Sequence, residues 1–116
     1  ASGTTLSFDG GGNSNTPKYY TAGNGTIRMY PQNTMSINAG GKKIASIEIV
    51  CNEYNGTLYN ASGNVAVSGS GTKTIEGAIV KFTGIDASSV VVTNKAEGSG
   101  GATQIRMETL KITYAK

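Results

Sequence analysis

The chain has 116 residues, a formal net charge of +3 and a sequence pI near 9.1, and it contains no His, no Trp and a single Cys. Without His, Ser-His-Asp and Cys-His catalysis are excluded, and so are most zinc and transition-metal sites. One Cys excludes an internal disulfide and a Cys-x-x-Cys site. The basic excess is small and spread along the chain, so we expect no nucleic-acid partner.

The composition indicates an all-β domain with long loops. Ile and Val number 10 and 7 against 3 Leu, and the 17 Gly, 11 Ser, 14 Thr and 10 Asn make up nearly half of the chain. Strands favour β-branched residues, whereas Gly, Ser and Asn favour turns. The length predicts a single domain over residues 1–116. We expect no membrane span, and we expect Ala1 to be an end cut from a longer precursor.

Alternation of apolar and polar residues predicts eight strands in chain order. They cover residues 4–8, 26–30, 34–38, 43–51, 65–67, 78–82, 89–93 and 104–114. A Gly-rich loop over 9–16 and a turn over 21–25 flank the short segment 17–20. No helical pattern separates the strands, so we expect an antiparallel sandwich rather than a parallel sheet.

The segment Pro31-Gln32-Asn33 predicts a tight turn, because Pro presets φ at the first turn position and Asn tolerates a positive φ. We therefore expect strands 26–30 and 34–38 to pair as a hairpin. Bulges are expected near 45–46 and 108–109, where the phase of the apolar residues changes.

The same alternation predicts a core between two sheets. The side chains expected to be buried are Leu6, Phe8, Ile27, Met29, Met35, Ile37, Ile47, Ile49, Cys51, Ile79, Val90, Val92, Ile105, Met107 and Ile112. In strand 78–82 the pattern does not decide which face points inward, since Ile79 shares a side with Lys81 and Val80 shares a side with Phe82. The predicted fold is an antiparallel β-sandwich, jelly-roll-like, of about eight strands, with the first and last strands side by side.

Several segments together resemble one known family. They are Thr-Pro-Lys-Tyr-Tyr (16–20), Thr-Ile-Arg-Met-Tyr (26–30), Asn-Thr-Met-Ser-Ile-Asn (33–38), Gly-Lys-Lys-Ile-Ala-Ser-Ile-Glu-Ile (41–49), Thr-Gly-Ile-Asp-Ala-Ser-Ser-Val-Val-Val-Thr (83–93) and Gln-Ile-Arg-Met-Glu-Thr-Leu-Lys-Ile-Thr-Tyr (104–114). This order resembles small β-sandwich modules near the C-termini of secreted or lipid-anchored surface proteins of Bacteroidota. The family commonly has Trp-Thr-Gly where this chain has Phe82-Thr83-Gly84. The resemblance implies an extracellular or cell-surface location and, by analogy, glycan binding.

The candidate ligand-binding residues are Lys18, Tyr19, Tyr20, Arg28 and Tyr30. A tyrosine ring can stack on the apolar face of a sugar, while Lys and Arg bond hydroxyl or carboxylate groups. We expect these residues to gather at one end of the sandwich beside loop 9–16. The function predicted is therefore a non-catalytic glycan-binding module.

Other interpretations stay open. The tyrosines can instead fill the end of the core, and Arg28 can form a cross-strand pair with a Glu, which would favour a structural or adhesive spacer. Glu48 and Glu108 are the candidate carboxylate pair of a hydrolase, although such an enzyme also needs a cleft. Asp9 and Asn13 offer oxygen ligands to calcium, but without the spacing of a dedicated loop. We expect no catalytic residue, metal or cofactor.

Overall fold

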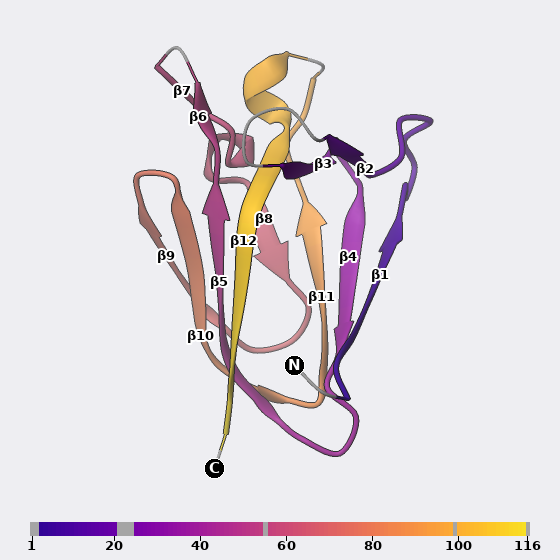
Figure 1. Cartoon of the computed structure of the whole chain (residues 1–116), viewed down its shortest axis with the longest axis vertical. Helices are drawn as coiled ribbons and strands as arrows, with labels where there is room; N and C mark the ends of the chain where they lie inside the picture. The colour runs from indigo at the N-terminus through magenta and orange to yellow at the C-terminus, as the bar shows by residue number, and fades with distance from the viewer. Residues whose placement is uncertain (1–2, 21–24, 55, 99, 116) are drawn as a thin grey trace.

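The computed structural model describes residues 3–20, 25–54, 56–98 and 100–115. It is an all-β structure in which two antiparallel sheets pack face to face (Figure 1). Two short 3-10 helices, Ala61–Gly63 and Gly101–Thr103, are the helical segments among these residues. The predicted turn over 21–25 lies almost entirely outside the described residues.

Each sheet is assembled from strands that are far apart in the sequence. The four-stranded sheet has the order β1-β4-β11-β8, and its strands are β1 (Thr5–Asp9), β4 (Thr34–Asn38), β11 (Ser89–Asn94) and β8 (Val65–Val67). The six-stranded sheet has the order β2-β3-β12-β5-β10-β9, and its strands are β2 (Lys18–Tyr20), β3 (Thr26–Met29), β12 (Ile105–Tyr114), β5 (Ile44–Cys51), β10 (Ile79–Ala87) and β9 (Thr72–Glu76). A separate hairpin joins β6 (Glu53–Tyr54) to β7 (Thr57–Leu58).

The chain changes sheets at most of its connections. From β3 it crosses to β4, returns to β5, crosses to β8, returns through β9 to β10, and crosses again through β11 to β12 (Figure 1). Interleaving of two antiparallel sheets in this way is the hallmark of jelly rolls. The predicted jelly-roll-like antiparallel sandwich is confirmed.

The predicted hairpin between strands 26–30 and 34–38 is wrong. The tight turn itself is present, since the Asn33 amide donates to the Tyr30 carbonyl over 2.9 Å, but β3 and β4 belong to different sheets. The positive φ of the turn, 73°, falls on Gln32 rather than on Asn33. Turn residues specify a reversal of direction, whereas the pairing of each strand depends on which sheet buries its apolar face.

Both predicted bulges are confirmed in the pairing of β12 with β5. Met107 pairs with Cys51 and Thr109 with Val50, which leaves Glu108 as the extra residue. At the other end of the same pair, Ala45 is the extra residue. The two bulges keep the apolar side chains of β12 on the inner side of the sheet. Ile105 and Met107 are buried, and Leu110, Ile112 and Tyr114 are half-buried.

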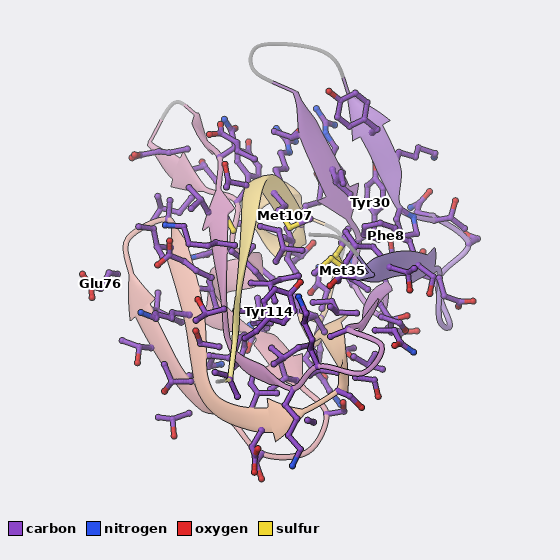
Figure 2. All side chains as sticks on the ribbon, turned by 60° about the horizontal axis from the view of Figure 1, so that its bottom comes forward. Phe8, Tyr30, Met35, Glu76, Met107 and Tyr114 are labelled. Carbon is purple, nitrogen blue, oxygen red and sulfur yellow. The ribbon has the colours of Figure 1, made fainter. Side chains whose placement is uncertain are left out.

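Most of the predicted core is buried between the two sheets. The buried members are Met29, Met35, Ile37, Ile47, Ile49, Cys51, Val90, Val92, Ile105 and Met107, while Ile27, Ile79 and Ile112 are half-buried. The orientation of β10, which the sequence pattern left undecided, is that Val80 and Phe82 face inward and Lys81 faces solvent. Met35 and Met107 come from opposite sheets and both lie inside the molecule (Figure 2).

Leu6 and Phe8 are the exceptions, with exposed fractions of 42% and 36%. Their register partners in β4, Ile37 and Met35, are fully buried, so Leu6 and Phe8 do project from the inner face of the sheet. They remain exposed because β1 is an edge strand, and the facing sheet ends on that side in the short strands β2 and β3 (Figure 1).

The expectation that the first and last strands lie side by side is also wrong. β1 pairs with β4, whereas β12 lies between β3 and β5 in the other sheet. The two strands meet near the N-terminus, where the hydroxyl groups of Thr4 and Tyr114 form a hydrogen bond.

Strand β9 was not among the predicted strands, because its five residues are all exposed and lack an apolar alternation. It forms the outer edge of the six-stranded sheet, and Glu76 at its end projects into solvent (Figure 2). Lys73 lies opposite the buried Phe82 and donates from Nζ to the Gly63 carbonyl over 2.6 Å. A charged residue on the inward side of an edge strand discourages pairing with another chain.

We predict that Phe82→Ala lowers the free energy of unfolding by about 3–5 kcal/mol, because the ring is 2% exposed and its removal leaves a cavity. Urea unfolding followed by circular dichroism measures this change. The neighbouring Lys81→Ala is the control and should change the free energy by less than about 0.5 kcal/mol. Equal effects of the two variants would contradict the inward placement of Phe82.

Candidate functional site

Asn33 is the first of two buried asparagines that organise one end of the sandwich. Its Oδ1 accepts a hydrogen bond from the Tyr30 amide over 2.9 Å. Its Nδ2 donates to the carbonyl groups of Gly10 and Asn15 over 3.0 and 2.9 Å. The side chain is fully buried, so its amide group fastens the loop 10–16 to the turn between β3 and β4.

Asn94 is the second buried asparagine and acts on a different loop. Its Nδ2 donates to the carbonyl groups of Met29 and Thr103 over 3.0 and 2.8 Å, and its Oδ1 accepts from the Ala96 amide over 2.9 Å. Its backbone amide also donates to the Asn33 carbonyl over 3.0 Å. The segments 95–98 and 100–104 are thereby fixed against the same turn.

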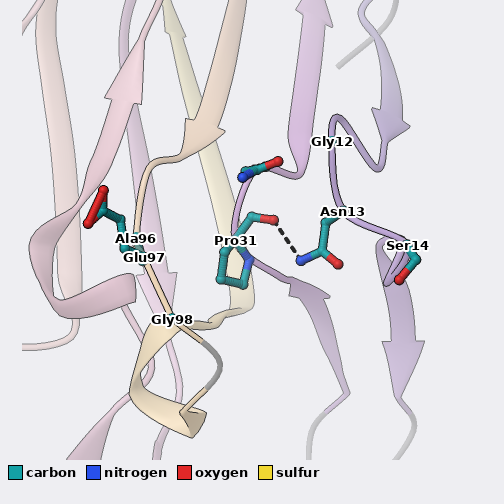
Figure 3. A pocket seen from close by; sticks show the side chains of 8 residues that line it. Gly12, Asn13, Ser14, Pro31, Ala96, Glu97 and Gly98 are labelled. Atoms are coloured by element: carbon teal, nitrogen blue, oxygen red, sulfur yellow. Dashed lines mark hydrogen bonds between the residues drawn. The ribbon is translucent and has the colours of Figure 1, made fainter.

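Loop 10–16 also packs directly on the turn. Asn13 donates from Nδ2 to the Pro31 carbonyl over 2.9 Å (Figure 3). Gly11 has a φ of +60°, and a Cβ at this position would lie 2.1 Å from the Gln32 carbonyl oxygen. Only glycine therefore allows this close approach.

Two adjoining pockets lie between these three segments. The first, of about 290 Å³, is lined by uncharged residues, and we call it the amide pocket because three of its side chains carry amide groups; its residues are Asn13, Asn15, Tyr30, Pro31, Gly98, Thr103 and Gln104. The second, of about 360 Å³, lies between Gly12–Ser14 and Ala96–Gly98, with Pro31 between these two segments (Figure 3). Asn13, Pro31 and Gly98 line both pockets. Pockets of this size suit a small group such as a single sugar residue.

Three cations lie beside the amide pocket on the outer face of the six-stranded sheet. In register, Lys18 of β2 is opposite Arg28 of β3, and Arg28 is opposite Arg106 of β12. Directly opposed residues project from the same face of a sheet. That face is the outer one, because Ile105 and Met107, which flank Arg106, are buried. We call Lys18, Arg28 and Arg106 the basic row.

Aromatic and amide side chains connect the basic row to the amide pocket. Lys18 Nζ lies 5.8 Å from the centre of the Tyr30 ring, which lines the pocket. The Arg106 guanidinium lies 3.7 Å from the centre of the Tyr59 ring, and its Nε donates to Gln104 Oε1 over 3.1 Å. Both distances to the rings are within the range of cation–π attraction.

The structure thus brings together three of the five candidate residues, namely Lys18, Arg28 and Tyr30. They lie beside loop 9–16, as expected. Tyr19 does not join them, since its register partner Ile27 projects from the inner face; its ring is 66% exposed at the sheet edge. Tyr20 pairs with Thr26 through its backbone, and its side chain is not among the described parts of the structure.

Arg106, Tyr59 and Gln104 were not among the candidate residues. The residues directly opposite Arg28 on the two adjacent strands are Lys18 and Arg106, so neither of these two positions holds a Glu. Arg106 is 78 positions from Arg28, and Tyr59 follows the β6–β7 hairpin, so no local pattern predicts these contacts. Only the position of β12 beside β3 brings them together.

The carboxylates considered for a hydrolase or a calcium site each have a partner within the protein. Glu48 lies on the outer face between Lys81 and Lys111, with the Lys111 ammonium 4.0 Å away, and Glu108 accepts from Asn52 over 2.8 Å. Asp9 Oδ1 accepts from the Gly11 amide over 2.7 Å and so shapes its own loop.

Within residues 3–20, 25–54, 56–98 and 100–115, no three Cys, Asp or Glu side chains come together as a metal-binding group. No helix in the described part of the chain is long and apolar enough to cross a membrane.

Cys51 is buried in the core as a free thiol, as the strand pattern predicted. Burial raises the pKa of the thiol to about 12, and the nearby Glu108 carboxylate adds to the rise. A thiol that holds its proton at neutral pH is a poor nucleophile.

Comparison with known proteins finds no matching family model, curated protein or solved structure. The resemblance to surface modules of Bacteroidota therefore stays a prediction. Assignment of a function depends on the site geometry.

We predict that Asn33→Ala lowers the free energy of unfolding by about 1–3 kcal/mol, because two carbonyl groups and one amide lose a buried partner. Urea unfolding measures the loss. Asn38→Ala is the matched control, since Asn38 is exposed and accepts the Gly40 amide bond in a surface turn. A loss at Asn33 no larger than the loss at Asn38 would show that the loops are held by other contacts.

We predict that a thiol reagent at pH 8 labels Cys51 only after the chain is unfolded in urea. The pKa of this thiol is higher in the folded state than its ordinary value of about 8.5. Its contribution to the free energy of unfolding is therefore complete below about pH 8.5. That contribution is lost as the pH rises toward 12. Unfolding free energies measured up to pH 11 should fall more steeply for the wild type than for Cys51→Ala. Rapid labelling of the folded protein would contradict the buried placement.

Proposed function

We propose that this chain is a non-catalytic glycan-binding module and that the amide pocket and the adjacent outer face form its binding site. The single observation that carries the proposal is the convergence of polar loop groups and tyrosine rings at one end of a rigid sandwich. Amide and hydroxyl groups of Asn13, Thr103 and Gln104 can bond sugar hydroxyls. Tyr30, half-buried at the rim of the pocket, supplies a ring for the apolar face of a sugar.

The support of the loops favours binding over catalysis. Asn33 and Asn94 fix the loops before any ligand arrives, so little conformational entropy is lost on binding. The site is built from neutral amides, hydroxyls, rings and cations, and the acidic pair of a glycoside hydrolase does not figure in it. We propose accordingly that the module assists binding by a larger secreted or cell-surface polypeptide. The segments that resemble Bacteroidota surface modules support this location.

A structural or adhesive role is the second candidate, and the exposed inner face of β1 favours it. Leu6 and Phe8 project from the core face of the sheet and are covered only in part. A neighbouring domain that covered them would remove apolar surface from water. In that case the module would serve as a spacer and would bind no small ligand.

Calorimetric titration with a broad panel of soluble polysaccharides tests the proposed function. We predict that the wild type binds at least one of them and that Tyr30→Ala abolishes the binding without unfolding the domain. Tyr114→Ala is the matched control, because Tyr114 is also half-buried but lies at the opposite end of β12. Absence of binding by the wild type across the panel would leave the spacer role as the better explanation.

A further inference from the structure

We propose that the ligand of this site is an acidic glycan, whose carboxylate or sulfate groups bind the basic row of Lys18, Arg28 and Arg106. The inference rests on the proposed function and names the class of glycan. Neighbouring strands are about 4.8 Å apart, so the row spans roughly 10 Å across three strands. A polysaccharide that carries an acid group on successive sugars can meet several of these cations at once.

The basic row concentrates positive charge on one part of the outer face. Arg28 lies between two other cations in register, in a chain whose net charge is only +3. Neighbouring charges of one sign raise the local potential, and this favours the approach of a ligand of the opposite sign.

Aromatic stacking holds the ends of the row in place. The Arg106 guanidinium is planar and lies over the Tyr59 ring, while its Nε donates to Gln104; its terminal N–H groups can bond an acid group in the bidentate mode. At the other end the Lys18 ammonium lies within cation–π range of the Tyr30 ring. The ring and guanidinium together also offer a flat surface that a sugar can contact.

Two acidic side chains near this end have other surroundings. Glu97 lines the second pocket and not the amide pocket, and Glu108 accepts a hydrogen bond from Asn52. The two ion pairs found in the described residues, Lys43–Asp86 and Lys111–Glu48, involve other cations. The amide pocket itself is lined by neutral groups, so acid groups can approach the row through it.

Matched pairs of polysaccharides test the proposal by calorimetric titration. Polygalacturonate is compared with fully methyl-esterified pectin, and dextran sulfate with dextran, so that each pair differs only in its charge. We expect binding to at least one acidic member, with much weaker binding to its neutral partner, and the preferred pair distinguishes carboxylate from sulfate. Raising NaCl from about 0.1 M to about 1 M shortens the Debye length from ~10 Å to ~3 Å and should weaken the binding strongly.

Charge-removing variants locate the site on the sheet. Arg106→Gln should weaken binding roughly tenfold or more, the size of one lost charge-assisted hydrogen bond. Lys111→Gln removes the same charge from the same face of β12 and should retain wild-type affinity. Lys18→Gln, at an exposed position, provides a second variant if Arg106→Gln does not fold.

The possible outcomes separate the two proposals. Equal binding of neutral and acidic partners, or equal losses in Arg106→Gln and Lys111→Gln, would overturn the acidic-glycan inference and leave glycan binding intact. Binding to no polysaccharide would overturn the proposed function itself. Tighter binding to single-stranded oligo-dT than to any polysaccharide would assign the basic row to nucleic acid and overturn both.

Discussion

The candidate site depends on two buried amide groups, those of Asn33 and Asn94. Each uses both its donor and its acceptor atoms, and together they connect three loops whose bonded residues reach from Gly10 to Thr103 in sequence. An unpaired polar group in such a position would be costly, but a fully bonded one defines a single loop arrangement. The end of the sandwich is therefore shaped by polar contacts, whereas its middle is shaped by packing.

The amino-acid sequence predicts strands better than it predicts their neighbours. Alternation located the buried residues of β4, β5 and β11, and changes of phase located both bulges, because these signals are local. The partner of β3 is a nonlocal property. Pro31 and Asn33 define a tight reversal, yet whether the next strand pairs with β3 or crosses to the facing sheet depends on the burial of all the strands together.

The candidate site was predictable to a similar extent. Tyrosines and cations cluster in the segment from Pro17 to Tyr30, which predicted a site there, and Lys18, Arg28 and Tyr30 do lie together. Arg106 was visible only as an outward residue of the last strand, since its place beside Arg28 follows from the topology of the sheet. Leu6 and Phe8 show the opposite case, in which a correct face does not ensure burial at the edge of a sheet.

The central position of β12 has a consequence for how the chain folds. β12 holds the C-terminal end of the described chain, yet it lies between β3 and β5 and completes both the basic row and the core of its sheet. Contacts between residues this far apart close slowly, because the entropy of the long intervening loops is lost before the contacts form. During synthesis, the inner edges of β3 and β5 therefore have no partner until β12 has emerged, so the six-stranded sheet is completed only after β12 has been synthesised.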